Sequence, residues 1–383
     1  MFLSKKERDE TIWACRFCMM CNCADRVAQV VRRESYTPRG RGAIMFALES
    51  GLLEYDEGVA DIMYTTLNDR LLQHWCVGNY DHEELVIDMR ARLFKKGLAP
   101  EEVVAFANRI KKNPIKGENP EKILSGAGVT MDSDSDTLLF CGSAALNSQQ
   151  STLICAGKLF NQAGQPLKVL SDEPSSGWAL YQLGDFEGAK QLSKRIAKKI
   201  RDCRVSKVVA LDADSYRMLM GRTTRFGGDI KGIKVHHINA LMADWFKNNQ
   251  IPVAGRISDT VTYHDPCVLA RFFEDVDSPR LILSKILKNP LKEMASSKKL
   301  ANCCGAGGML PLHRPDVSDQ VAGLRIDEAA DTGASVLVSG CPRCDDKFKR
   351  SMAARGQDDM RIINLVELVA EAAGLTFPTN PNH

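Results

Sequence analysis

The chain has 383 residues, 44% of them hydrophobic and 26% charged, which is enough for two or three globular domains. A formal net charge of +3 argues against nucleic acid or an acidic membrane surface as the main partner. Neither a bilayer-length apolar run nor a signal-peptide pattern occurs, so we expect a cytoplasmic protein. In that reducing compartment the 13 cysteines are expected to serve metal or redox chemistry.

Residues 1–120 are predicted to be mostly helical. Residues 42–55 have helical periodicity with a stop at Gly51, and residues 82–97 form an amphipathic pattern with a basic end. The stretch 111–122 is charged and rich in Pro and Gly, which predicts a linker.

The N-terminal run CRFCMMC has the C-x2-C-x2-C spacing that opens a bacterial ferredoxin motif. In two-cluster ferredoxins, each cluster takes its fourth cysteine from the other run. One complete set of ligands is present: Cys15, Cys18, Cys21 and Cys76. The positions of the other set hold no thiol: Asp25, Thr66, Asp69 and Leu72.

The loss of one whole set beside the survival of the other predicts a single cubane [4Fe–4S] cluster in this region. Cys23 is out of register and is interpreted as a bystander. A zinc site built from Cys15, Cys18, Cys76 and either Cys21 or Cys23 is an open alternative, because tetrahedral thiolate ligation suits zinc equally well. Unligated buried thiols are a third.

After residue 130, short apolar runs alternate with helical segments, which predicts α/β architecture with largely parallel sheets. The predicted strands are residues 137–142, 166–171, 207–212, 233–238, 260–265 and 335–340.

Five more cysteines in the C-terminal part are expected to converge if each lies at the end of a strand or the start of a helix, where open α/β sheets bind ligands. They are Cys267, Cys303, Cys304, Cys341 and Cys344. A fifth thiolate exceeds what a cubane needs and suggests an opened cluster or a bridging sulfur. We expect Gly305, Gly307 and Gly308 to fold the backbone tightly and aim N–H groups at the cluster, with a plain flexible turn as the alternative. His264 and His313 flank the motif as candidate proton donors, or as ordinary core or loop histidines.

The middle of the chain repeats this C-terminal pattern with most thiols replaced. Cys141, Ser175-Ser176-Gly177 and Asp212-x-x-Ser215 follow at similar spacings. The repeat therefore predicts a first unit that keeps one thiol of five and holds no cluster.

The segments YHDPC, NCCGAGG and VLVSGCPRC together resemble the cysteine-rich CCG domain of heterodisulfide reductase subunits. Related iron–sulfur subunits serve glycolate oxidase, lactate utilisation and anaerobic glycerol-3-phosphate dehydrogenase. The resemblance implies a helical ferredoxin-like domain (1–120), a degenerate CCG repeat without a cluster (130–250) and an intact CCG repeat (255–375). It also implies a noncubane [4Fe–4S] cluster on the five C-terminal cysteines, in addition to the cubane.

The resemblance implies an iron–sulfur electron-transfer subunit that relays electrons between a partner flavoprotein, or an electron-transferring flavoprotein, and a quinone or another redox subunit. Any flavin belongs to the partner, and no catalytic residue is assigned. The alternative is a catalytic subunit that reduces a disulfide at the CCG cluster. Location in the cytoplasm, or at the inner face of a membrane as part of a complex, fits both. A basic docking surface formed by Arg32, Arg33, Arg39 and Arg41 is a further hypothesis, with a solvated helix face as the alternative.

Overall fold

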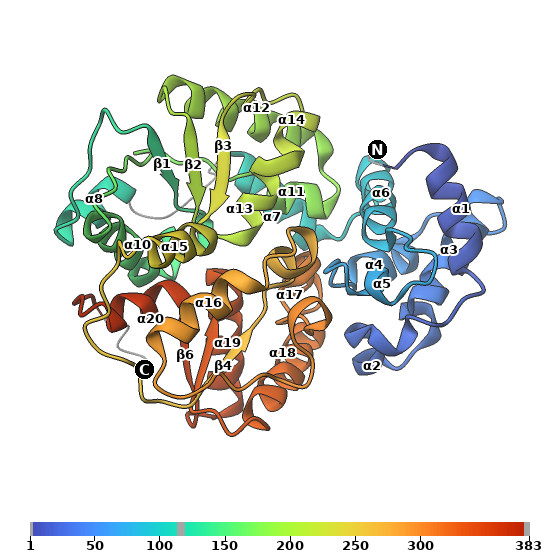
Figure 1. The fold of residues 1–383 in the computed structure, drawn as a ribbon. Helices are drawn as coiled ribbons and strands as arrows, with labels where there is room; N and C mark the ends of the chain where they lie inside the picture. The colour runs from blue at the N-terminus through green and yellow to red at the C-terminus, as the bar shows by residue number, and fades with distance from the viewer. Residues whose placement is uncertain (1–2, 113–118, 379–383) are drawn as a thin grey trace.

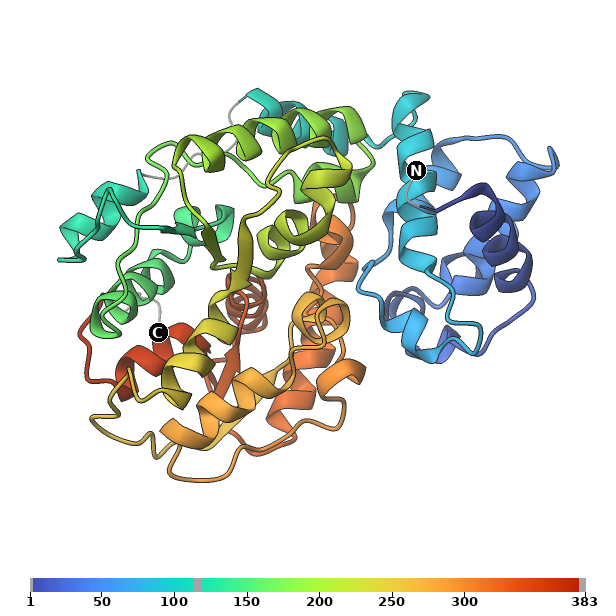
Figure 2. The ribbon, with the colours of Figure 1, turned by 45° about the horizontal axis from the view of Figure 1, so that its top comes forward.

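The computed structural model describes residues 3–112 and 119–378. Helices α1–α6 lie to one side of a larger body that contains both sheets (Figures 1 and 2). None of the helices in the described ranges is both long and apolar enough to cross a bilayer. The N-terminal elements are α1 (Lys5–Cys15), η1 (Asn22–Ala24), α2 (Arg26–Val31), η2 (Glu34–Tyr36), α3 (Pro38–Glu49), α4 (Glu57–Tyr64), α5 (Leu71–Trp75), α6 (His82–Lys95) and α7 (Glu101–Lys112).

The predicted helical character of this region is confirmed. The pattern at 42–55 is the end of α3, which stops before Gly51, and the pattern at 82–97 is α6. Thr37 caps α3 by accepting a hydrogen bond from the Gly40 N–H, and Pro38 occupies the first helical turn, where a missing N–H costs nothing. Half of the predicted linker, residues 113–118, lies outside the described residues, and its flanks belong to α7 and α8.

The body consists of two units, each built on a three-stranded sheet. The first unit contains α8 (Pro120–Gly126), β1 (Thr137–Phe140), α9 (Ser143–Asn147), α10 (Gln150–Gln162), α11 (Trp178–Leu183), α12 (Phe186–Asp202), β2 (Lys207–Ala210), α13 (Ala213–Arg217), η3 (Met218–Arg222), α14 (Thr223–Arg225), β3 (Lys234–His237) and α15 (Ile238–Lys247). The second contains β4 (Val261–His264), η4 (Val268–Phe272), α16 (Asp277–Ile286), η5 (Lys298–Leu300), η6 (Gly307–Met309), α17 (Leu310–His313), α18 (Pro315–Ala330), β5 (Val336–Ser339), α19 (Pro342–Arg355), β6 (Arg361–Asn364) and α20 (Leu365–Ala372).

Both sheets are fully parallel and have the same strand order, β1-β2-β3 and β4-β5-β6. The predicted α/β class is therefore confirmed. Five of the six predicted strands correspond to β1–β5. The prediction at 166–171 is wrong, because only Lys168 forms a bridge there, to Leu138. Strand β6 was not predicted.

The two units are packed as a related pair. Helix α10 packs on α20, and its counterpart α16 packs on α15, the counterpart of α20. One hydrophobic core runs through both contacts and includes Phe160, Trp245, Ile282 and Leu368. Because parallel strands end at the same edge of each sheet, this arrangement places equivalent loops of the two units in equivalent positions.

His313 joins the N-terminal helices to the second unit. Its ring nitrogens lie 2.8 Å from Asp61 on α4 and 2.5 Å from Glu102 on α7. Burial alone lowers the pKa of His313, but its hydrogen bonds to Asp61 and Glu102 outweigh burial and raise it above the ordinary value. The histidine is thus a charged link rather than part of a cysteine site.

Replacing His313 with Gln is expected to remove a pH-dependent part of the stability. A histidine whose pKa is higher in the folded than in the unfolded protein stabilises the fold. The stabilisation is complete at pH values below the unfolded-state pKa of about 6.5, and it is lost as the pH rises through the folded-state pKa. Urea unfolding should show a loss of about 1 kcal/mol in the variant at pH 6 that shrinks towards alkaline pH. His236→Gln is the control, because its pKa is lowered. An equal loss at all pH values would contradict the charged link.

Candidate metal centres

The first site, here called the outer site, consists of Cys15, Cys18, Cys21 and Cys76. Cys15 ends α1, Cys21 precedes η1 and Cys76 follows α5. Burial and then repulsion by the other three thiols raise the pKa of Cys15 to about 12. The structure therefore brings together the four cysteines that the ferredoxin spacing selects.

Cys23 takes no part in this group: it is exposed, and its thiol donates to the Met20 carbonyl. Four thiols that repel one another as anions favour a metal that stabilises the thiolate form, which is what a [4Fe–4S] cluster or a zinc ion supplies. The residues present thus fit an iron–sulfur cluster, and the chemistry of four thiolates does not by itself exclude zinc.

Cys76→Ser is expected to remove about four of about eight irons per chain, because a four-iron cluster is held as one unit on four thiolates. Cys23→Ser, two residues beyond the ferredoxin run, is the matched control and should leave iron and acid-labile sulfide unchanged. The measurement is iron and sulfide analysis of protein purified without oxygen. Loss of iron in the Cys23 variant, or none in the Cys76 variant, would show that the ligand set is different.

The sequence Pro-Arg-Gly-Arg at residues 38–41 begins α3, which packs against α1 beside the outer site. Arg41 is fully buried, forms an ion pair with Asp25 and donates to the Tyr36 carbonyl 2.8 Å away. A side chain at Gly42 would meet the Cys15 Cβ at 2.9 Å, so glycine lets α1 and α3 approach closely. The hypothesis that Arg41 belongs to a docking surface is therefore wrong.

The second site, here called the inner site, lies where the strands of the second sheet end. Cys267 follows β4 by three residues, and Cys341 follows β5 by two and precedes α19, which contains Cys344 in its first turn. Cys303 and Cys304 approach from the loop after η5. Four of the five are buried and Cys267 is half-buried.

These five thiols contact one another. A chain of sulfur hydrogen bonds links Cys267 to Cys303, Cys303 to Cys304, and Cys304 to Cys344. Hydrogen bonds from Cys303 and Cys344 lower the pKa of Cys304 to about 6. Cys341 lies next to Cys344 and completes the group. A largely buried set of five thiols fits an iron–sulfur cluster and offers one more sulfur than a tetrahedral metal site uses.

The glycine turn allows the N-terminal region to approach the inner site. Gly305 has φ +90°, and a Cβ there would lie 2.5 Å from the Ser318 carbonyl. Side chains at Gly307 and Gly308 would collide with the carbonyls of Leu67 and Thr66. The backbone N–H that reaches a thiol in this turn is that of Ala306, which donates to Cys304. Close packing thus explains these glycines directly.

His264 lies beside the inner site. A ring nitrogen of His264 and the sulfurs of Cys304 and Cys344 lie within 4.8 Å of one another. Arg325 donates to Nδ1 at 3.1 Å, so in the neutral ring the proton is on Nε2. Among the described residues, His264 Nε2 is buried and has no hydrogen-bond partner. Its N–H is therefore available to donate to a sulfur of the inner site.

The inner-site cavity includes side chains that sequence reasoning missed. Arg343 forms a 3.0 Å ion pair with Asp214 of the first unit, and both residues line the cavity. Arg343 stands inside the motif C-P-R-C, so the motif itself was the available signal. The other lining residues from outside the second unit are Asn68, Trp178 and Ala213.

The first unit has no thiol at any of the five corresponding positions. Cys267 is the third residue after β4, and the third residue after β1 is Ser143, not Cys141. The alignment of Cys141 with Cys267 is therefore wrong, and the unit keeps none of the five thiols. The counterparts are Ser143, Ser175, Ser176, Asp212 and Ser215, with Gly177 (φ +86°) in the place of Gly305.

The comparisons with known proteins agree with this geometry. A family profile described as "CCG: Cysteine-rich domain" matches residues 261–349. The chain is 30% identical over 315 residues to the D subunit of dihydromethanophenazine:CoB–CoM heterodisulfide reductase from Methanosarcina mazei, covering 78% of this chain and 75% of that protein. It is 23% identical over 224 residues to EtfAB:quinone oxidoreductase of Syntrophomonas wolfei, covering 56% of this chain and 31% of that protein.

Among solved structures, the crystal structure of a hypothetical protein from Helicobacter pylori superimposes with a TM-score of 0.62. It covers 98% of this chain and 74% of that chain at 13% identity, which shows a shared fold alone.

A CCG domain combined with a helical N-terminal region and clustered cysteines defines an iron–sulfur oxidoreductase subunit. This chain belongs to the family of the D subunits of heterodisulfide reductase.

Proposed function

We propose that this protein is the electron-transfer subunit of a larger oxidoreductase, and that it relays electrons between a partner flavoprotein and a further acceptor, a quinone or another redox subunit. The observation that carries the proposal is the presence of two separate groups of interacting thiols in one chain, one partly exposed and one largely buried. An exposed group suits exchange with a partner, and a buried group suits control of the local environment.

In this proposal Cys15, Cys18, Cys21 and Cys76 hold a cubane [4Fe–4S] cluster, and the five inner-site cysteines hold a noncubane one. The proposed division of the chain has three parts. The helical domain is residues 1–120, the degenerate repeat is residues 130–250, and the intact repeat is residues 255–375. Bound clusters supply one-electron chemistry. The chain contributes thiolate ligands, the Ala306 N–H, the His264 N–H and burial, each of which tunes the stability of the reduced state.

A partner protein is supported by the surface around the outer site. Half of the large hydrophobic side chains that are exposed in the described ranges lie within two residues of an outer cysteine. They are Trp13, Phe17, Met19, Met20, Trp75 and Val77. Clustered exposed apolar groups are typical of protein–protein interfaces. The name of the S. wolfei relative, an EtfAB:quinone oxidoreductase, supports a flavoprotein on one side and a quinone on the other. Any association with a membrane would then come through partners.

A second candidate function is reduction of a disulfide at the inner site. The M. mazei relative is named as part of a heterodisulfide reductase, and the His264 N–H beside Cys304 and Cys344 is placed to donate a hydrogen bond to a sulfur anion. Reduction of one disulfide to two thiols consumes two electrons and two protons. Because burial and the neighbouring Arg325 lower the pKa of His264 well below its ordinary value, its neutral ring would stabilise a developing thiolate, and the protons would come from solvent.

The decisive experiment begins with protein purified without oxygen. Iron and sulfide analysis is expected to give about eight irons per chain for two four-iron clusters, and a zinc-only protein would overturn both functions. Dithionite-reduced protein, freed of excess reductant, is then mixed in a stopped-flow instrument with a water-soluble naphthoquinone or with a small aliphatic disulfide. Reoxidation by the quinone alone supports the relay, whereas rapid reoxidation by the disulfide with release of two thiols supports catalysis.

A further inference from the structure

The four positions of the missing second ferredoxin ligand set meet in one place. Although they come from two distant segments, Asp25, Thr66, Asp69 and Leu72 all line a single cavity between η1, α5 and the start of α6. Oxygen and hydrocarbon side chains cannot replace four thiolates, so these residues do not fit the cluster that a two-cluster ferredoxin carries here. The cavity coincides with the position that the spacing assigns to that cluster.

This cavity lies on the side of the N-terminal helices that faces the inner site. Asn68 lines both the cavity and the inner-site cavity. The carbonyls of Thr66 and Leu67 lie against Gly308 and Gly307. The set that the chain has lost is therefore the one adjacent to the inner site, and the set that it has kept is the more distant one.

Buried ion pairs now occupy the position. Asp25 pairs with Arg41, and Asp69 pairs with Arg271 of the second unit at 2.9 Å. The Arg271 side chain is fully buried and also donates to the Asp69 and Ala301 carbonyls. The space that remains for water centres is about 20 Å³, room for about one water molecule.

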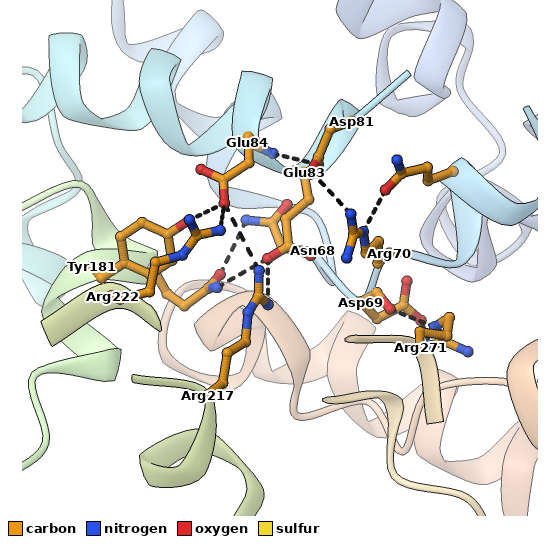
Figure 3. Close-up of polar contacts among 12 residues, drawn as sticks. Asn68, Asp69, Arg70, Asp81, Glu83, Glu84, Tyr181, Arg217, Arg222 and Arg271 are labelled. Carbon is orange, nitrogen blue, oxygen red and sulfur yellow. Dashed lines mark hydrogen bonds and ion pairs between the residues drawn. The ribbon is translucent and has the colours of Figure 1, made fainter. Parts of the chain in front are cut away.

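A second group of polar contacts nearby reaches the first unit, as Figure 3 shows. Arg217 of α13 donates to Glu83 at 2.8 Å, and Arg222 forms an ion pair with Glu84. Asn68 donates to the Gln182 side chain at 3.2 Å. Charged groups at the vacated position thus tie the N-terminal helices to both units.

We propose that this cavity is a vacated iron–sulfur position, converted into a polar junction that holds the N-terminal helices on both units and leaves a redox-inactive gap between the outer and inner sites. The proposal rests on the proposed function, since it concerns the path between two clusters. In this arrangement the electron path has two iron–sulfur clusters separated by protein, where a two-cluster ferredoxin domain would add a third cluster between them. Asp25–Arg41 and Asp69–Arg271 are the groups that took over the place of the cluster.

The test is to restore the ligands in the full chain. A variant with Asp25→Cys, Thr66→Cys, Asp69→Cys and Leu72→Cys, reconstituted without oxygen from ferrous iron and sulfide, is expected to hold about twelve irons where the wild type holds about eight. Its matched control carries serine at the same four positions, which removes the same contacts and adds no thiol. The control should gain no iron.

A second variant guards against loss of the fold when the pair between Asp69 and Arg271 is broken. It keeps Asp69 and introduces the other three cysteines, and it is expected to gain about three or four irons. A folded cysteine variant that retains the parental iron and gains none overturns the proposal.

A spectroscopic measurement on the wild-type protein tests the gap between the two sites independently. Electron paramagnetic resonance of the reduced protein should show two signals without mutual magnetic splitting, and the four-cysteine variant should show splitting. Strong splitting in the wild type overturns the gap and leaves the relay standing. Absence of iron from the wild type overturns the relay itself.

Discussion

Cys304→Ser is expected to remove the whole C-terminal cluster, about four of about eight irons, and to leave the spectral signature of the outer site in place. Cys304 accepts hydrogen bonds from Cys303, Cys344 and the Ala306 N–H, so it is the sulfur that the surrounding groups stabilise most strongly as a thiolate. Serine has a similar size and a far higher pKa, so the variant tests ligation rather than packing. Iron analysis and electron paramagnetic resonance provide the measurement.

Cys203→Ser is the matched control for that experiment. Cys203 follows α12 in the first unit, far in sequence from either group, and its half-buried thiol has none of the nine proposed ligands among its electrostatic neighbours. Its replacement should change neither the iron content nor the spectrum. If Cys304→Ser retained all of its iron, the five-cysteine assignment would be wrong.

Arg90→Met is expected to destabilise the protein by about 3–5 kcal/mol, because the change leaves several buried carbonyls without a donor. Arg90 is fully buried on α6, and its acceptors are all backbone oxygens. They include Met63 at 2.8 Å, Gln182 of the first unit at 2.8 Å and Gly308 of the second unit at 2.7 Å. One side chain therefore joins three parts of the molecule, and chemical unfolding should report its loss.

Arg92→Met, two residues further along the same helix, is the comparison. Arg92 is partly exposed and pairs with Glu49 and Asp88, so its replacement should cost about 1 kcal/mol or less. An equal loss of unfolding free energy in the two variants would mean that the carbonyls that accept from Arg90 are hydrated once the arginine is gone.

The strands that the sequence predicts correctly are short β-branched or aliphatic runs bounded by turns. Strand β6 was not predicted because no turn bounds it. Residues Arg361–Asn364 continue directly into α20, and the apolar residues of the strand and the helix form one pattern. Residues 166–171 have a strand-like composition, but only Lys168 reaches the neighbouring strand. Pattern indicates which residues are apolar, and tertiary pairing decides whether they form a ladder.

The candidate ligands are readable from sequence because thiol spacing is a local signal. The polar junction is not. Glu83, Arg217 and Arg271 come from three distant segments, and no spacing rule relates them. The two-position error at Cys141 has a similar cause: loop lengths differ between the two units, and only the paired strands fix the correspondence.

The different exposure of the two cysteine groups has a consequence at the bench. Cys18 is open to solvent, whereas Cys303, Cys304, Cys341 and Cys344 are covered by protein. Dioxygen attacks accessible sulfur first, so brief contact with air should bleach the protein in two stages, the N-terminal centre before the C-terminal one. Material handled in air and found to hold half the metal would then be a damaged sample of the complete protein.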